Sequence, residues 1–171
     1  MGNNLLELTG VSAELQRKRI IDTINLAVPK RSRVSIIGTS GCGKSTLLKL
    51  IAGLLRAPAW QVTGQAAIEG KCFNAGDSAT LLTNCGRQYA FIAQDSLSIF
   101  DPRLKIKEHF LEISRLRDGE KEEFLLQVMS LLRNLLITDP ERVLESYRNE
   151  LSGGTLQRIS IAMGLIHKPR L

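Results

Sequence analysis

Residues Gly38 to Thr46 read G-T-S-G-C-G-K-S-T, which fits the pattern G-x-x-x-x-G-K-[ST] of a loop that binds phosphate. Glycine lets the backbone adopt positive φ and approach a ligand that a Cβ would keep away. The loop then points N–H groups inward, and a helix that begins at its end adds about half a positive charge. The residues predicted to hold phosphate are Gly38, Thr39, Ser40, Gly41, Cys42, Gly43, Lys44, Ser45 and Thr46.

The flanking sequence supports this prediction. Arg33–Ile37 has the apolar content of a short buried strand and Ser45–Ala52 that of a helix, so strand, turn and helix follow in the order that such a loop needs. Lys44 is expected to reach the β- and γ-phosphates, and the Ser45 hydroxyl to bind Mg²⁺. The alternative is a glycine-rich surface turn with an incidental lysine, which the flanking elements disfavour.

The composition is that of an ordinary globular domain. Of 171 residues, 43% are hydrophobic and 23% charged. No apolar run approaches the roughly 18 residues of a membrane helix and the N-terminus has no secretory signal, so we expect a cytosolic location unless a partner carries the protein to a membrane. The net charge of +6 comes from dispersed Lys and Arg, which favours a solvated basic surface over a nucleic-acid site. Cys42, Cys72 and Cys85 form no C-x-x-C pair and are expected to be reduced thiols.

Polarity patterns predict further strands in the first half of the chain and helices in the second. The predicted strands are Leu5–Leu8, Ile24–Val28, Ala66–Lys71 and Tyr89–Ala93, the first two being antiparallel and joined through Leu15–Arg19. Gln94 follows the last of them, at the edge where α/β sheets bind ligands. Apolar residues at helical spacing predict helices over Ile106–Leu116 and Phe124–Leu135 and a last helix after Gly154, and Pro140 predicts the start of a short helix over Glu141–Tyr147.

A second candidate anion site is the stretch Leu151, Ser152, Gly153, Gly154 and Thr155, which places a serine and two glycines at the start of that last helix. A hydroxyl and exposed N–H groups at a helix N-terminus can face phosphate. Ordinary helix capping explains the same residues when the stretch is taken alone. Its value therefore lies in its combination with the first loop.

The order of these motifs resembles the nucleotide-binding subunit of ABC transporters over nearly the whole chain. The resemblance implies an α/β fold: a P-loop NTPase core with an antiparallel β subdomain and an inserted α-helical subdomain, the C-terminal part of the core being missing. It implies that Gly38–Thr46 is the Walker A loop and that Leu151–Thr155 is the signature motif. Gln94 would be the Q-loop residue, which touches Mg²⁺ or the attacking water. The implied division is 1–96 for the core and antiparallel part, 97–166 for the helical subdomain, and 167–171 for the start of the Walker B region.

The same resemblance implies the cofactors and partners. ATP and Mg²⁺ would bind, and two subunits would pair head to tail, so that each signature motif closes on ATP held by the other subunit. Transmembrane permease subunits would place the chain on the cytoplasmic face of the inner membrane, and an extracytoplasmic substrate-binding protein would act indirectly. Homodimer and heterodimer both remain open.

Two stretches look most like the peptide and nickel importers: Gln94–Pro102, and Arg142–Tyr147 leading into Asn149–Arg158. Several residues depart from the family pattern. Thr155 stands where glutamine or methionine is usual, and Arg148 and Ser96 stand where proline is common. The adenine-stacking aromatic expected near Leu15 is absent, which implies weaker binding of the base.

In the family, a Walker B strand with an Asp-Glu pair follows a segment like His167–Leu171, and no such pair follows the signature in this sequence. Leu135–Asp139 imitates an apolar run ending in aspartate, but Pro140 follows it, so a helix end and a loop are expected there. His109 and His167 are expected to be surface residues. We therefore expect the 171 residues alone to bind nucleotide, to hydrolyse ATP slowly or not at all, and to be marginally stable.

Two alternatives to an importer ATPase stay open. The chain could be a truncated remnant that occupies nucleotide or a partner without turnover. It could also belong to the ABC-type DNA repair or chromosome ATPases, which separate the two motifs by long coiled coils. Because Lys44 to Ser152 holds no sustained heptads, the second alternative is disfavoured.

Overall fold

The computed structural model describes residues 4–84, 88–95, 98–114 and 121–171. These residues divide into two compact units. The first contains the chain up to Phe91 together with Arg170 and Leu171, and the second contains Ile92–Pro169. Each unit has its own cluster of buried apolar side chains.

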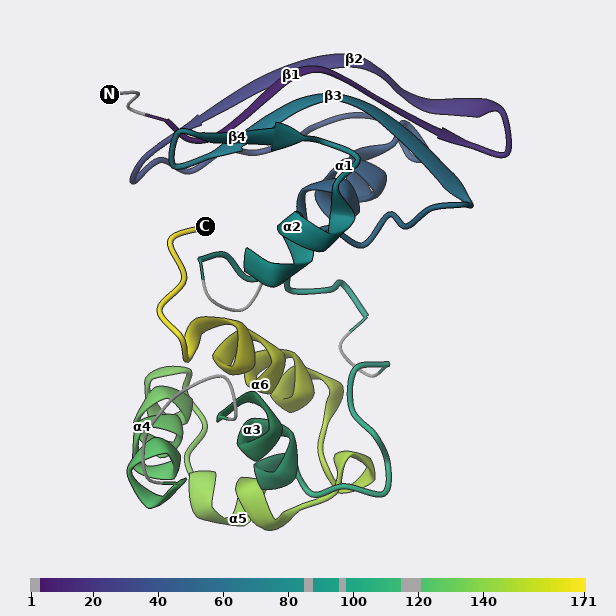
Figure 1. Ribbon diagram of the computed structural model, residues 1–171. Helices are drawn as coiled ribbons and strands as arrows, with labels where there is room; N and C mark the ends of the chain where they lie inside the picture. Colours follow the sequence, from purple (N-terminus) through teal and green to yellow (C-terminus); the bar gives the residue numbers. More distant parts are fainter. Residues whose placement is uncertain (1–3, 85–87, 96–97, 115–120) are drawn as a thin grey trace. The chain divides into compact units, whose positions relative to one another are not determined.

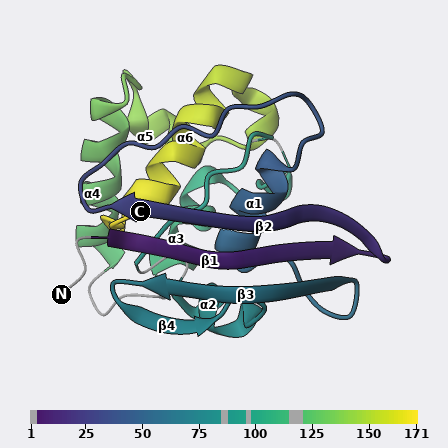
Figure 2. The ribbon, with the colours of Figure 1, turned by 90° about the horizontal axis from the view of Figure 1, so that it is seen from above.

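The first unit is built on a four-stranded antiparallel sheet in the order β2-β1-β3-β4 (Figure 2). Its strands are β1 (Asn4–Leu15), β2 (Lys18–Pro29), β3 (Trp60–Ile68) and β4 (Lys71–Asn74). The two predicted N-terminal strands are confirmed and are longer than expected. Only Gln16 and Arg17 connect them, and both have positive φ, as a tight two-residue hairpin requires. The prediction of one strand over Ala66–Lys71 is wrong, because a turn at Glu69 and Gly70 divides it between β3 and β4.

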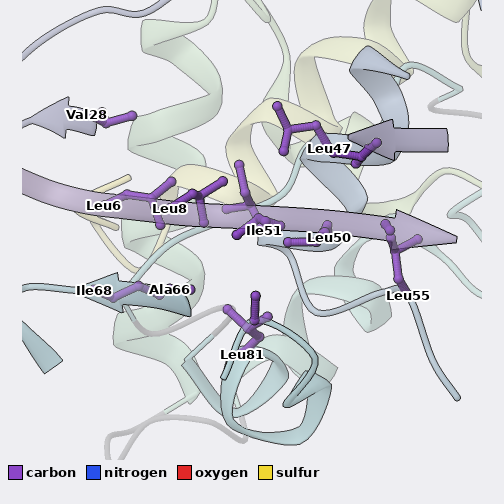
Figure 3. Close-up of a cluster of buried hydrophobic side chains, with 14 of the residues drawn as sticks. Leu6, Leu8, Val28, Leu47, Leu50, Ile51, Leu55, Ala66, Ile68 and Leu81 are labelled. Atoms are coloured by element: carbon purple, nitrogen blue, oxygen red, sulfur yellow. The ribbon is translucent and has the colours of Figure 1, made fainter. Parts of the chain in front are cut away.

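Two helices, α1 (Lys44–Ile51) and α2 (Ser78–Asn84), cover one face of this sheet (Figure 1). The helix after the glycine loop is confirmed and ends where expected, with Gly53 at φ 71 just beyond it. The apolar face of α1 packs toward the sheet (Figure 3). The cluster drawn there includes Leu6, Leu8, Val28, Leu47, Leu50, Ile51, Leu55, Ala66, Ile68 and Leu81. The sequence did not predict α2.

Two predicted strands are wrong. Arg33–Ile37 has no strand hydrogen bonds, and its Val34 and Ile37 are 47% and 92% exposed. Tyr89–Ala93 contributes only a single bridge position at Tyr89. Both segments have strand-like composition, but composition does not supply the neighbouring strand that a ladder requires. Within the described residues, the partner found for the second segment is the chain's own last residues: Ala90 N–H donates to Leu171 O at 2.9 Å, and Arg170 N–H donates to Gln88 O at 2.7 Å.

Within the described residues, the second unit consists of four α-helices, which the sequence predicted, and one short 3₁₀ turn, which it did not. They are α3 (Ile106–Ser114), α4 (Lys121–Asn134), α5 (Pro140–Glu145), the short 3₁₀ turn η1 (Arg148–Glu150) and α6 (Gly153–Leu165). Their buried residues form one cluster, which includes Phe100, Ile106, Phe110, Val128, Leu132, Leu156, Ile159 and Ala162. The aspartate of the apolar run lies in a loop, as expected: Asp139 Oδ1 accepts from Arg142 N–H at 3.0 Å and caps α5.

The segment that precedes α3 is fastened to the segment that precedes the signature motif. Ile106 N–H donates to Ser146 O at 3.0 Å, and Lys105 and Lys107 both reach the Glu145 carboxylate, at 2.8 and 2.6 Å. Hydrogen bonds from Lys105, then Lys107, lower the pKa of Glu145 to about 2. These contacts connect residues nearly forty positions apart and fix the start of α3 within its unit.

The expectation that His109 is a surface residue is wrong. Its side chain is 6% exposed and packs edge-on against Phe100, with ring centroids 5.3 Å apart. The sequence placed it beside the apolar face of α3, where an aromatic ring can replace an aliphatic one. Cys85, Ser96 and Leu97 lie outside the described residues. Across the part of the chain that the structure describes, none of the helices has the length and apolar character to cross a membrane.

Candidate functional site: a phosphate-binding loop and a signature helix

The glycine loop enters α1 through backbone conformations that only glycine adopts without strain. Gly41 has φ 80 and Gly43, the residue that caps α1, has φ 95. A Cβ on Gly43 would lie 3.0 Å from Ile20 O in β2, whereas one on Gly41 would meet nothing within 4 Å. The loop therefore packs closely against β2 at Gly43 and is open to solvent at Gly41.

Lys44 holds the loop in shape. Its Nζ donates to Gly38 O at 2.8 Å and to Thr39 O at 2.6 Å, and lies 3.7 Å from Cys42 Sγ. These contacts fold the side chain back over the first half of the loop. An ammonium group bonded to two loop carbonyls lies within the loop, where it can exchange them for phosphate oxygens.

The start of α1 offers unpaired donors. The first intrahelical bond runs from Leu47 N–H to Gly43 O at 2.8 Å, and no described residue accepts from the N–H groups of Lys44, Ser45 or Thr46. No acidic side chain occupies the first turn. Free N–H groups, a helix N-terminus and a lysine fit a polyphosphate, and a magnesium ion bound to its oxygens would find the Ser45 hydroxyl at the same helix end.

The hairpin between β1 and β2 lies next to the glycine loop, because Ile20 O in β2 is 3.0 Å from the position of a Cβ on Gly43. Its tip carries Gln16 and Arg17 and adjoins Leu15, near which an aromatic residue was expected. Arg19 is engaged with Glu14 and Asp22, and its hydrogen bond to Glu14 is the main cause that raises its pKa. None of these described side chains supplies an aromatic platform for a base.

An apolar cavity of about 190 Å³ lies beneath the unpaired segment that precedes the loop. Val34 and Ile36 line one side, and Phe91 and Leu171 line another. Segment 33–37 thus has the apolar side chains expected of a buried strand, but it pairs with no strand among the described residues, and Val34 and Ile36 line the cavity instead.

The signature residues form the start of α6 in the second unit. Ser152 Oγ accepts from Thr155 N–H at 3.2 Å and lies 2.9 Å from Thr155 Oγ1, so Ser152 caps the helix. A Cβ on Gly153 or Gly154 would meet nothing within 4 Å. These glycines therefore leave the backbone at the helix start open to a ligand or a partner.

Arg158 is a residue to which the sequence assigned no role, although it lies within a quoted motif. Its Nη1 donates to Leu136 O at 2.9 Å and its Nε donates to Gly154 O at 3.3 Å. It thereby joins the loop after α4 to the first turn of α6. The signal was its position, four residues after Gly154 on the same helix face. A pocket of about 270 Å³ with mixed polar and apolar walls is lined by this arginine and by Leu136, Arg142, Ser152 and Thr155.

The predicted residues are distributed between the two units. The loop Gly38–Thr46 belongs to the first, and Gln94 and Leu151–Thr155 belong to the second. Gln94 is exposed and lies in a bend. The described residues contain no cluster of three or more His, Cys, Asp or Glu side chains that could hold a metal ion by itself.

A comparison with solved structures identifies the fold class of this chain. The structure resembles the dimeric ATP-binding cassette MJ0796, solved with bound ADP and phosphate, with a TM-score of 0.76 at 24% identity over 96% of this chain and 70% of that one. The predicted fold class, an α/β P-loop NTPase core with an antiparallel β part and inserted helices, is confirmed. Residues 21–171 match the family described as ABC transporter, and the chain belongs to that family.

Two curated relatives are named as ATP-binding proteins of import or transport systems. The chain is 31% identical over 156 residues to the metal-staphylopine import system ATP-binding protein CntD of Staphylococcus aureus, covering 89% of this chain and 56% of the relative. It is 31% identical over 152 residues to the oligopeptide transport ATP-binding protein OppD of Haemophilus influenzae, covering 88% and 47%. The chain thus spans about half the length of the curated relatives that it matches.

Proposed function

We propose that this chain is the ATP-binding part of an ABC importer subunit. The observation that carries the proposal is the open cradle at the start of α1, where three N–H groups lack acceptors among the described residues and Lys44 Nζ is held above the loop. Such a cradle suits the β- and γ-phosphates of a nucleoside triphosphate better than a single small anion.

The proposed roles follow from the chemistry of each group. The backbone from Gly38 to Thr46 binds the phosphates, and Lys44 Nζ exchanges its loop carbonyls for phosphate oxygens. The Ser45 hydroxyl and Gln94 are the proposed protein ligands for Mg²⁺, which supplies charge neutralisation at the phosphates when bound. The first unit is the nucleotide-binding core with its antiparallel sheet, and the second is the helical subdomain.

The signature stretch Leu151–Thr155 is proposed to contact nucleotide held by a second ATP-binding subunit. The free faces of Gly153 and Gly154 support this, because they let another subunit approach the helix N-terminus closely. Permease subunits, and a substrate-binding protein acting through them, are the further partners that we propose, with the chain on the cytoplasmic side of the membrane. The names of CntD and OppD support metal chelates or peptides as the cargo class.

We infer that residues 1–171 by themselves turn ATP over slowly or not at all. No acidic residue follows the signature motif in these 171 residues, so a carboxylate at that place in the sequence, which would orient the attacking water, is not among them. Binding does not need that carboxylate. A phosphate-release assay at saturating MgATP should give the same background rate for the wild-type chain and for Lys44→Ala. Clear turnover above that background would contradict this inference.

Calorimetric titration with MgATP tests the proposed function. Lys44→Ala should weaken binding by roughly ten- to a hundredfold, because one charge-assisted contact to phosphate is lost. Lys49→Ala is the matched control, since Lys49 is an exposed lysine in the last turn of the same helix. Equal affinity for wild type and Lys44→Ala would contradict the proposal.

A further inference from the structure

Leu136 combines an unfavourable backbone with an exposed apolar side chain. Its φ is +60°, and its side chain is 79% exposed. Among the described residues, the other positive-φ residues besides glycine are all polar: Gln16, Arg17, Thr23, Arg31, Glu69 and Lys168. A left-handed conformation costs an L-residue stability, and solvent exposure recovers nothing for a leucine.

Helix termination explains why residue 136 has a left-handed backbone, but it does not explain why that residue is a leucine. Leu136 N–H donates to Arg133 O at 2.9 Å and Ile137 N–H donates to Leu132 O at 3.0 Å, which is the bond pattern that ends a helix with one left-handed residue. Glycine or asparagine would serve there with less strain. The leucine side chain therefore points to a use outside the unit.

The position of Leu136 indicates where that use lies. It lines the same pocket as Ser152 and Thr155 of the signature stretch. Its carbonyl is held by Arg158 Nη1 at 2.9 Å, and the same arginine holds Gly154 O. Arg158 thus fixes the strained loop to the helix start that we propose meets a second subunit.

We propose that Leu136 is an apolar contact to a second copy of this chain, at the edge of the surface formed by the signature stretch. The proposal rests on the proposed pairing of signature motifs with a second subunit. The occupant is a second copy because the contact is continuous with that surface. In a symmetric pair Leu136 is buried twice, so its loss weakens association by about ten- to a hundredfold.

The test compares three variants of the 171-residue chain by sedimentation with MgATP. Leu136→Gln keeps the strained conformation and removes the apolar surface, so the dimer should dissociate at least about tenfold more readily than wild type. Leu126→Gln makes the same change at a leucine that is 62% exposed on α4, and should dimerise as wild type does. Leu136→Gly relieves the strain, so its melting temperature should rise by about 2–4 °C while its dimer weakens.

The outcomes separate the Leu136 contact from the proposed pairing of two subunits. Wild-type dimerisation with unchanged association of both Leu136 variants would overturn the contact and leave Leu136 as a helix terminator only. Equal weakening by Leu136→Gln and Leu126→Gln would overturn it as well, because the effect would not be local. A wild-type chain that stays monomeric with MgATP would overturn both this contact and the proposed pairing.

Discussion

Substituting Gly43 by alanine tests how the loop is held. At φ 95, an L-residue costs about 1–2 kcal/mol. The new Cβ would also stand 3.0 Å from Ile20 O, a backbone atom of β2 that has little freedom to move. We expect the two effects together to lower the free energy of unfolding by about 2–3 kcal/mol, or to push the loop away from β2.

Gly41→Ala is the matched control, because it has the same kind of strain at φ 80 but its Cβ meets nothing within 4 Å. Urea unfolding followed by circular dichroism should show Gly43→Ala as the less stable of the two by about 1 kcal/mol. If the loop shifts instead, MgATP affinity should fall by roughly tenfold in calorimetry. Equal stability and equal affinity for the two variants would refute the reasoning that packing against Ile20 positions the cradle.

Three further changes probe other parts of the fold. Gly64→Ala in β3 would place a Cβ 2.6 Å from Gly10 O and should cost about 3–5 kcal/mol by urea unfolding, whereas Gly70→Ala, with open space at φ 80, should cost about 1–2 kcal/mol. Because the pKa of Glu145 is lowered to about 2 from about 4.5, its contacts stabilise the fold above pH 4.5, and that contribution is lost as pH falls toward 2; Glu145→Gln should flatten this part of the stability profile. Ser152→Ala removes the cap of α6 and should cost about 1 kcal/mol, with Ser98→Ala, an exposed serine outside the helices, as the control.

Elements that depend on local periodicity could be predicted from the sequence. The helices α3, α4, α5 and α6 and the hairpin of β1 and β2 were predicted because their contacts lie within a few residues or across one tight turn. The strand prediction for segment 33–37 was wrong because a strand needs a neighbouring strand, which the local sequence does not specify. The missed α2 did carry a signal, since Asp77 precedes it and accepts from Thr80 N–H at 3.1 Å as a helix cap.

The candidate site could also be predicted from the sequence only in part. The glycine loop and the signature stretch were visible as motifs, since each requires fixed residue types at fixed spacing. The closeness of Gly43 to Ile20 and the bond of Arg158 to Leu136 O were not, because they join residues from separate elements. The burial of His109 against Phe100 could not be predicted for the same reason.

Amide chemical shifts offer the most direct test that the loop binds nucleotide. In an ¹⁵N-labelled chain titrated with MgATP, the largest shifts should fall on the amides of Gly41, Gly43, Lys44 and Ser45, with the Gly70 amide in the β3–β4 turn as an unaffected reference. The account predicts that these loop shifts saturate and that Lys44→Ala weakens them. Saturating shifts located elsewhere, or none in the loop at millimolar MgATP, would contradict it.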